Sequence, residues 1–525
     1  MIVVRTCLGF RLRLHICHIP ARLRRSMILS TLGLPFPHGF VFGFQHENFP
    51  GGSPILGFHT NKGGRKRHKQ THHGRCYRGF EDIKLIKDAG LNSYRFSISW
   101  SRILSKGSLS SGINQEGMDH YNSFIDELIK NGEKAGITPF VTIYHFDMPL
   151  ALEEKYGGLL NRSFVDYSEL LFKIFGERVK HWFTINEPNV LAQYGYEIGI
   201  SPPGRCSLPS TLCALRSPVK CFETVCPCKF GGNSSTEPYL AAHNMILAHA
   251  TVAKLYREKY QEQQKGEVGI VLVSQYFLPY TESEEDKAAA GRLFDFYLGW
   301  FMGPLVFGDY PQSMRERVKE RLPTFSAEEK VLLNGSLGFV GINYYTSSYA
   351  KHKAPPPGEA LHYSFDTWAE TIGKCVVNFF LTVQTDGHWP EGLQKLLEYV
   401  EDKYQNPKVY ISENGISDHK DNGSPLEVLL EDPYRISFVT RHLFRINKAI
   451  KNGVNVKGYI YWALFDDFEW GMGFERCGIY FVDFNNYTRH PKRLGEMNAC
   501  TSQEASDIMI MYLSLKMFSW HAIKK

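Results

Sequence analysis

No stretch of this 525-residue chain has the uninterrupted apolar length of a membrane-spanning helix. Hydrophobic residues make up 43% of the chain and charged residues 22%, which is typical of a soluble globular enzyme. Internal repeats of the solenoid type are also missing. The composition therefore predicts a globular catalyst or binding protein without a membrane partner.

Acidic residues are almost absent from the first 80 positions. This region holds 13 Lys and Arg but only one acid, Glu47, whereas the rest of the chain holds 47 bases and 53 acids. The bases gather in two runs and do not spread over a folded face, so we predict no nucleic-acid partner. We interpret residues 1–35 as an atypical basic N-terminal segment. Arg11 and Arg13 interrupt its apolar stretch, so it is not a clear signal peptide, and a plastid is an alternative destination to the secretory route.

Cysteine pairs with C-x-x-C spacing are missing, although five of the 11 cysteines fall within residues 206–228. No histidine stands near them at ligand spacing either, so we expect no metal. A disulfide in this loop is the better interpretation. It would imply an oxidising compartment.

Eight short apolar runs alternate with helical patterns along the chain. Most are continuously apolar, as expected of parallel strands that are covered on both faces. They predict an α/β fold, a single (β/α)8 TIM barrel over 36–493, with loop insertions at 189–268 and 347–407 around the C-terminal face of the strands and an atypical tail at 494–525. The eight runs are 39–44, 93–100, 138–147, 181–188, 269–280, 337–346, 408–415 and 456–467.

Polar residues capable of chemistry cluster where these runs end. Barrel enzymes place their active sites at this face, because the carboxyl ends of all eight strands meet there. The polar residues at the strand ends are His145, Asp147, Asn186, Glu187, Asn343, Tyr345, Glu413, Asn414, Asp466 and Asp467.

Two carboxylates stand out, Glu187 in TINEP and Glu413 in ISENG. Cleaving an acetal requires a proton for the departing oxygen and a partner for the oxocarbenium-like centre, and two carboxyl groups in different environments supply both. Burial after an apolar strand is expected to raise the pKa of Glu187 and keep it protonated. Glu413 must stay ionised to attack, and Arg95 and Tyr345 are the candidate partners.

Together these motifs resemble the family 1 glycoside hydrolases, specifically the plant β-glucosidase branch. The resemblance rests on TINEP, ISENG, YRFSISWSRI, HFDMPLAL and YWALFDDFEWGMGF, and runs from about residue 36 to 493. It implies a retaining β-glucosidase that removes terminal non-reducing β-D-glucosyl residues from small molecules or oligosaccharides by double displacement, without a metal or other cofactor. The thioglucoside-cleaving branch carries Gln at the acid/base position, so Glu187 favours O-glycosides. The resemblance also implies a secreted or vacuolar protein, and leaves the oligomeric state open.

The resemblance assigns roles to the matched positions. Glu187 would be the acid/base and Glu413 the nucleophile, with Tyr345 and Arg95 orienting and stabilising Glu413. Trp462 would be the platform under the sugar ring. The family disulfide would join Cys206 to Cys213 or to Cys228. The substrate-binding residues would be Gln45, His145, Asn186, Tyr345, Trp462, Glu469 and Trp470.

Several segments depart from the family pattern. Gln45 lies in the shortened segment FGFQHENFPGG, and Cys477 stands where a Phe is expected after Arg476. The run 386–393 is also short, and the last helix is replaced from about residue 494. Damage to a first strand or last helix would prevent barrel closure and leave an unpaired strand edge. One alternative to an active hydrolase is therefore a catalytically impaired sugar-binding protein of the same fold. Another is a transglucosidase, since an alcohol can intercept the covalent glycosyl intermediate instead of water.

Overall fold

The computed structural model describes residues 36–46, 80–131, 136–156, 163–207, 231–372, 389–418, 424–469 and 474–495, except residues 38 and 90. The predicted N-terminal segment 1–35 and nearly all of the predicted tail 494–525 lie outside these ranges. Both stay predictions.

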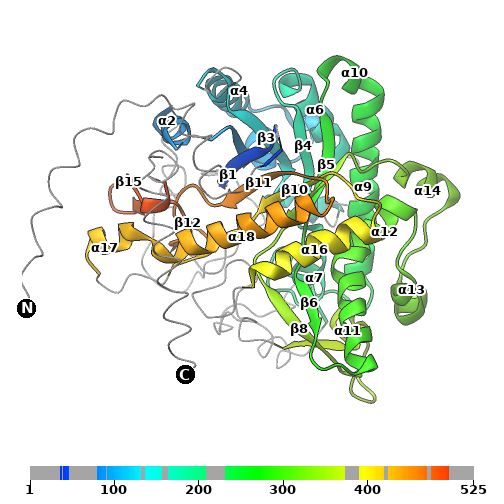
Figure 1. The fold of residues 1–525 in the computed structure, drawn as a ribbon. Coiled ribbons are helices and arrows are strands. Elements are labelled where there is room, and N and C mark those ends of the chain that lie inside the picture. The colour runs from blue at the N-terminus through cyan, green and yellow to red at the C-terminus, as the bar shows by residue number, and fades with distance from the viewer. Residues whose placement is uncertain are drawn as a thin grey trace, which may run out of the picture.

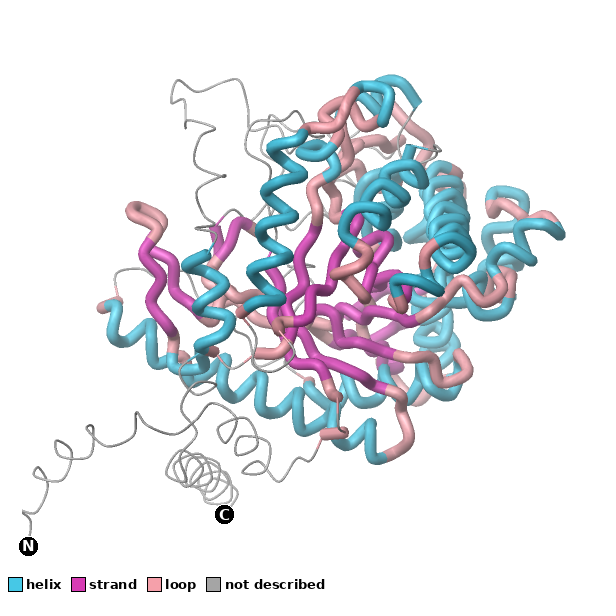
Figure 2. Tube along the Cα trace, turned by 90° about the horizontal axis from the view of Figure 1, so that it is seen from above, coloured by secondary structure: helices cyan, strands magenta, loops and turns pink. Residues whose placement is uncertain are grey.

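Eight parallel strands close into a barrel, which confirms the predicted fold. Each barrel strand pairs with the next one along the chain, and β1 pairs with both β2 and β11. The expectation that the altered first strand would prevent closure is wrong, because β1 keeps both of its partners. The strands run through the centre of the molecule and the helices lie outside them (Figure 1, Figure 2). The barrel strands are β1 (Val41–His46), β2 (Ser93–Ser97), β3 (Thr138–Tyr144), β4 (His181–Asn186), β5 (Glu267–Val273), β7 (Phe339–Asn343), β10 (Val409–Glu413) and β11 (Val456–Trp462).

An apolar cluster fills the barrel interior beneath a layer of polar side chains. The guanidinium of Arg95 lies 4.9 Å above the ring of Phe183, which belongs to this cluster. A second and larger apolar core separates the strands from the surrounding helices. The strands are therefore buried on both faces, which explains their continuously apolar sequences. The interior cluster consists of Phe140, Phe183, Val271, Phe339, Tyr410 and Ile460.

Several of the helices that cover the barrel bury one apolar stripe. In α16 (Pro390–Lys403) the buried side chains include Leu393, Leu396, Leu397 and Val400, a spacing that places them on one helical face. This helix packs beside α18 (Pro433–Lys451) on one side of the barrel (Figure 1). Other covering helices are α2 (Phe80–Asp88), α4 (Gln115–Lys130), α6 (Ser163–Phe175), α9 (Glu237–Lys259) and α14 (Ala327–Leu333).

The predicted run 269–280 is two strands, not one. β5 ends at Val273, and β6 (Tyr276–Pro279) joins a separate three-stranded sheet with β8 (Ser347–His352) and β9 (Ala369–Ile372). The segments predicted as loop insertions also contain regular structure, because 189–268 includes most of α7 and all of α9, and 347–407 includes β8, β9 and α16. None of the helices in the described ranges is long and apolar enough to cross a membrane.

Shorter elements complete the described part of the chain. Those before β10 are α3 (Trp100–Ile103), η2 (Leu109–Ser111), α5 (Leu150–Tyr156), α7 (Pro188–Tyr196), α10 (Gln261–Gln264), α11 (Glu284–Phe294), the π-helical η3 (Asp295–Gly299), α12 (Trp300–Phe307), α13 (Gln312–Val318), η4 (Lys319–Arg321) and α15 (Tyr363–Asp366). Those after β10 are α17 (Leu426–Glu431), β12 (Asp467–Phe468), β13 (Phe474–Glu475), β14 (Tyr480–Asp483) and β15 (Thr488–Pro491).

Candidate active site

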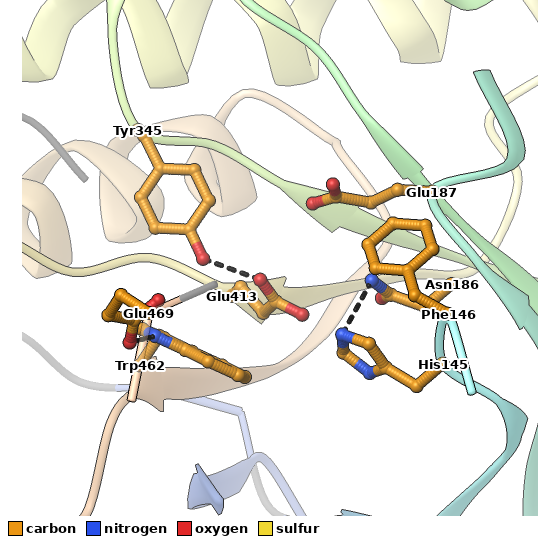
Figure 3. Close-up of a pocket in the computed structure, with 8 residues that line it drawn as sticks. All are labelled: His145, Phe146, Asn186, Glu187, Tyr345, Glu413, Trp462 and Glu469. Carbon is orange, nitrogen blue, oxygen red and sulfur yellow. Dashed lines mark hydrogen bonds between the residues drawn. The ribbon is translucent and has the colours of Figure 1, made fainter. Parts of the chain in front are cut away.

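A pocket with about 220 Å³ of empty space, part of it open to solvent, lies at the carboxyl ends of the barrel strands. Residues at the ends of β3, β4, β7, β10 and β11 point into it, and the loop after β12 adds one more (Figure 3). The pocket brings together seven predicted site residues and one that was missed, Phe146. The lining residues are His145, Phe146, Asn186, Glu187, Tyr345, Glu413, Trp462 and Glu469.

Glu187 is the residue between β4 and α7. Its backbone lies in the left-handed region, with φ 47° and ψ 53°, and its amide donates to the carbonyl of Val271 at 3.0 Å. Pro188 then begins α7, a position where proline suits a helix. Left-handed backbone is uncommon for a side chain of this kind, and such strain concentrates at functional sites. The turn between strand and helix therefore holds the Glu187 side chain over the barrel.

The environment of the Glu187 carboxyl group favours its neutral form. The side chain is buried, and burial, followed by the nearby charge of Glu413, raises the pKa of Glu187 to about 8. The hydrogen bond that Oε1 accepts from Asn343 Nδ2 at 2.6 Å lowers this pKa but has a smaller effect. A carboxyl group with this pKa is mostly protonated at neutral pH, as the sequence predicted.

Glu413, the last residue of β10, has a cation and a hydroxyl group as partners, whereas Glu187 has a neutral amide. Arg95 Nη1 donates to Oε1 at 2.9 Å, and the hydroxyl of Tyr345 donates to Oε2 at 2.5 Å (Figure 3). Burial, and then the charge of Glu413, raises the pKa of Tyr345 well above its usual value, so its phenol stays a proton donor. One cation and one hydroxyl group therefore hold the two oxygens of Glu413.

Arg95 connects three strands beneath the pocket. From β2, its Nη2 donates to Asn186 Oδ1 at 2.7 Å and its Nε donates to Thr142 Oγ1 at 3.1 Å. Nη1 also reaches the carbonyl of Ser412 at 3.1 Å. The side chain is fully buried, so the fork of the guanidinium sets the relative positions of Asn186 and Glu413.

Asn343 is a contact of the site that the sequence marked only as a polar strand end. Besides donating to Glu187, its side chain accepts a hydrogen bond from Ser412 Oγ at 2.6 Å. Asn343 lies on β7, the neighbour of β10, while Glu187 follows β4. The signal in the sequence was its place at the end of the sixth apolar run, which did not reveal its partner.

The wall opposite Glu187 is formed by Trp462 and Glu469 (Figure 3). Trp462 ends β11, and its Nε1 donates to Glu469 Oε1 at 2.7 Å. Burial, followed by the charge of Asp467, raises the pKa of Glu469 to about 8. Gly415 permits the approach of β11 to the loop after β10, because a Cβ at this glycine would lie 1.9 Å from the carbonyl oxygen of Trp462.

His145 and Asn186 meet at the third side of the pocket. Asn186 Nδ2 lies 3.1 Å from His145 Nε2, and the same amide accepts from Arg95 through its oxygen. With the amide oriented in this way, His145 Nε2 acts as the acceptor. Phe146 follows with φ 60°, which turns its ring toward Asn186 and Glu187 (Figure 3).

Some predicted residues are only partly placed or lie outside the described part of the chain. The backbone of Gln45 on β1 is in register with Arg95 on one side and Trp462 on the other, at the pocket end of the barrel. The Gln45 side chain and the whole of Trp470 lie outside the described residues. So do Cys213 and Cys228, and the disulfide stays a prediction. In the described ranges, no three His, Cys, Asp or Glu side chains gather in a way that could hold a metal ion.

A sequence profile described as glycosyl hydrolase family 1 matches residues 61–497, most of the chain. The chain belongs to glycosyl hydrolase family 1. The family resemblance drawn from the motifs is thereby confirmed, and with it the prediction of an O-glycosyl hydrolase.

Curated relatives and solved structures agree with this family. The chain is 41% identical over 484 residues to β-glucosidase 11 of Oryza sativa subsp. japonica, covering 87% of each protein. It is 46% identical over 424 residues to furostanol glycoside 26-O-β-glucosidase of Hellenia speciosa, covering 78% of this chain and 71% of the relative. The crystal structure of the rice β-glucosidase Os3BGlu6 superposes with a TM-score of 0.79 at 38% identity, covering 90% of this chain and 98% of the other.

Proposed function

We propose that this family 1 enzyme is a retaining β-glucosidase in which Glu187 is the acid/base and Glu413 the nucleophile. Its family and its β-glucosidase relatives make it a hydrolase of terminal β-D-glucosyl residues. A mutant of the rice neighbour forms a covalent complex with glucose, which fits double displacement. One observation carries the division of roles: two buried carboxyl groups line one pocket in opposite surroundings, one beside a neutral amide and one beside a guanidinium.

In the first step Glu413 attacks the anomeric carbon and Glu187 protonates the departing oxygen. The bond from Glu413 to the sugar forms as the glycosidic bond breaks, and the proton of Glu187 leaves with the aglycone. Arg95 and Tyr345 hold Glu413 as a charged and directed carboxylate before the attack. The product of this step is a glycosyl ester of Glu413.

In the second step the same Glu187 acts as a base. Esterification removes the negative charge of Glu413, which is one cause of the raised pKa of Glu187. The pKa of Glu187 therefore falls in the intermediate, and its carboxylate takes a proton from the incoming water. Water attacks the anomeric carbon, the ester bond breaks, and glucose leaves with its β configuration.

The remaining pocket residues are proposed to bind the sugar. Trp462 provides a flat apolar face under the ring, and Glu469 provides a carboxyl group that forms hydrogen bonds with the sugar hydroxyls. On the other side of the sugar, His145 and Asn186 form directional hydrogen bonds with its hydroxyl groups, and Asn186 binds the 2-hydroxyl. Gln45 and Trp470 are proposed as further contacts by the family resemblance.

Small-molecule β-glucosides or oligosaccharides are the proposed substrates. The furostanol glycoside 26-O-β-glucosidase of Hellenia speciosa supports the first class, since it acts on furostanol glycosides. We further propose a secreted or vacuolar location, which the cysteine-rich loop supports and which a fluorescent fusion would test. Signal from plastids in that experiment would favour the alternative interpretation of residues 1–35.

The proposed roles are tested by nitrophenol release from aryl β-glucosides and by rescue with azide. We expect Glu413→Gly to lose at least about 10³-fold in kcat, and azide to restore turnover with formation of the inverted α-glucosyl azide. Glu359→Gly, an exposed loop residue, serves as the control and should keep wild-type activity. A wild type no faster than Glu413→Gly would support the sugar-binding alternative, and a mainly alkyl glucoside product in added alcohol would indicate a transglucosidase.

A further inference from the structure

The carboxyl group of Glu469 receives a second hydrogen bond from a residue outside the pocket lining, Cys477. The thiol Sγ donates to Glu469 Oε1 at 3.2 Å, beside the 2.7 Å bond from Trp462 Nε1 to the same oxygen. Another acceptor, the carbonyl of Phe465, lies farther away at 3.8 Å. Since a thiol has one hydrogen to give, the nearer carboxylate is its main partner.

The two oxygens of Glu469 have different surroundings. Oε1 is held by Trp462 and Cys477, whereas Oε2 accepts no hydrogen bond from any residue in the described ranges. Glu469 is 1% exposed and lines the sugar pocket, so its second oxygen is left for a polar group that enters the pocket. The hydroxyl groups of a bound sugar are polar groups of that kind, and they can donate to a carboxyl group or accept from it.

We propose that Cys477 is a positioning residue for the glycone, whose thiol fixes the Glu469 carboxyl group so that Oε2 faces the sugar hydroxyls. This inference rests on the proposed function and adds a determinant of glycone selectivity to it. Cys477 does not touch the substrate. It acts through Glu469, and its effect should therefore depend on which sugar hydroxyls are present.

The surroundings of Cys477 suit a fixed donor. The residue is fully buried in a small cluster with Tyr345, Trp462 and Ala463. Its carbonyl accepts from the amide of Ala463 at 3.4 Å and from Arg435 Nη1 at 3.4 Å, which anchors the backbone. Burial, and then the charge of Glu469, raises the pKa of the Cys477 thiol well above its usual value, so the proton stays on sulfur.

Packing alone is the competing explanation, because a buried cysteine also fills space. Three variants at this one position separate the two. Cys477→Ser keeps a donor, Cys477→Val fills the space without a donor, and Cys477→Ala removes both. Each is assayed with nitrophenyl β-glucoside and with the three analogues that lack the hydroxyl at C3, C4 or C6, and thermal melting reports the folded state.

We expect Cys477→Ala and Cys477→Val to lower kcat/KM on the glucoside roughly 2- to 10-fold, the range of one hydrogen bond, and Cys477→Ser to stay near wild type. The loss in kcat/KM should nearly disappear on at least one deoxy analogue, because that analogue lacks the hydroxyl group that Glu469 binds. Equal losses on all four substrates, or losses that follow the melting temperature, would leave only packing and overturn the inference. A wild type that cleaves none of the four substrates would instead contradict the proposed function, so the two failures are distinguishable.

Discussion

Arg95 donates to Glu413 from one terminal nitrogen at 2.9 Å and to Asn186 from the other at 2.7 Å. A single buried guanidinium thus sets the spacing between the proposed nucleophile and the amide beside the proposed acid. Both bonds come from a planar fork, and a lysine ammonium cannot reproduce them. The geometry of the catalytic pair therefore depends on a side chain that stands beneath it on another strand.

Replacing this fork should damage both activity and stability. We expect Arg95→Lys to lower kcat by about 10²-fold or more, because Glu413 and Asn186 lose their common support. Leaving the buried Asn186 oxygen without its guanidinium donor should also cost roughly 1–3 kcal/mol of the free energy of unfolding. Steady-state kinetics and urea unfolding measure the two effects. Arg315→Lys, which alters an exposed pair with Asp309, is the control, and an equal effect in both variants would contradict this account.

The alkaline side of the pH profile should report Glu187. An acid with a pKa of about 8 loses its proton as the pH rises through that value, so kcat/KM should fall above roughly pH 8. The hydrogen bond from Asn343 favours the charged form, so Asn343→Ala should move this limb to higher pH. Asn131→Ala, at the end of α4, should leave it in place. A limb that moves to lower pH in Asn343→Ala would show that Asn343 does not act on Glu187 in this way.

Glu187 should lower stability at neutral pH. Its pKa is 4.5 as a free side chain and about 8 in the fold, so the folded chain binds more protons between these values and its stability falls as the pH rises through them. Glu187→Gln keeps an acceptor for Asn343 and cannot ionise. We expect it to raise the free energy of unfolding at pH 7 by roughly 1–3 kcal/mol, with the gain vanishing below about pH 4.5. Denaturation at both pH values, with Glu359→Gln as control, tests the sign.

The need for Glu187 as an acid should depend on the leaving group. We expect Glu187→Ala to lose about 10²–10⁴-fold in kcat/KM on glucosides whose leaving group is a poor one. The loss should be far smaller for dinitrophenyl glucoside, because dinitrophenolate departs without a proton. A series of aryl glucosides measures this as a steeper dependence on leaving-group acidity. A uniform loss across the series would mean that Glu187 binds the substrate but does not protonate the departing oxygen.

The barrel could be predicted because its strands are buried on both faces and their sequences are therefore continuously apolar. The break after Val273 could not, since residues 269–280 remain apolar while the chain passes from the barrel to a second sheet. The helices within 189–268 were also missed. The long interval between two predicted strands was interpreted as a loop insertion, although α9 is the longest helix in the described part of the chain.

The proposed catalytic pair could be located because strand ends in a barrel converge on one face. Their partners were harder to foresee. Asn343 and Glu187 are 156 positions apart, and only the ring of strands brings them together. Cys477 and Glu469 are eight positions apart, but the contact depends on the path of the loops between β11 and β14, for which no periodic pattern exists.

Trapping with a 2-deoxy-2-fluoro β-glucoside tests the central claim most directly. Fluorine slows both steps, and a good leaving group lets the first one proceed, so a covalent sugar should accumulate on the enzyme. We predict that peptide mass spectrometry finds the sugar on Glu413 and that the first glucose released from a normal substrate is the β anomer. A sugar on any other residue, or α-glucose as the first product, would contradict the account.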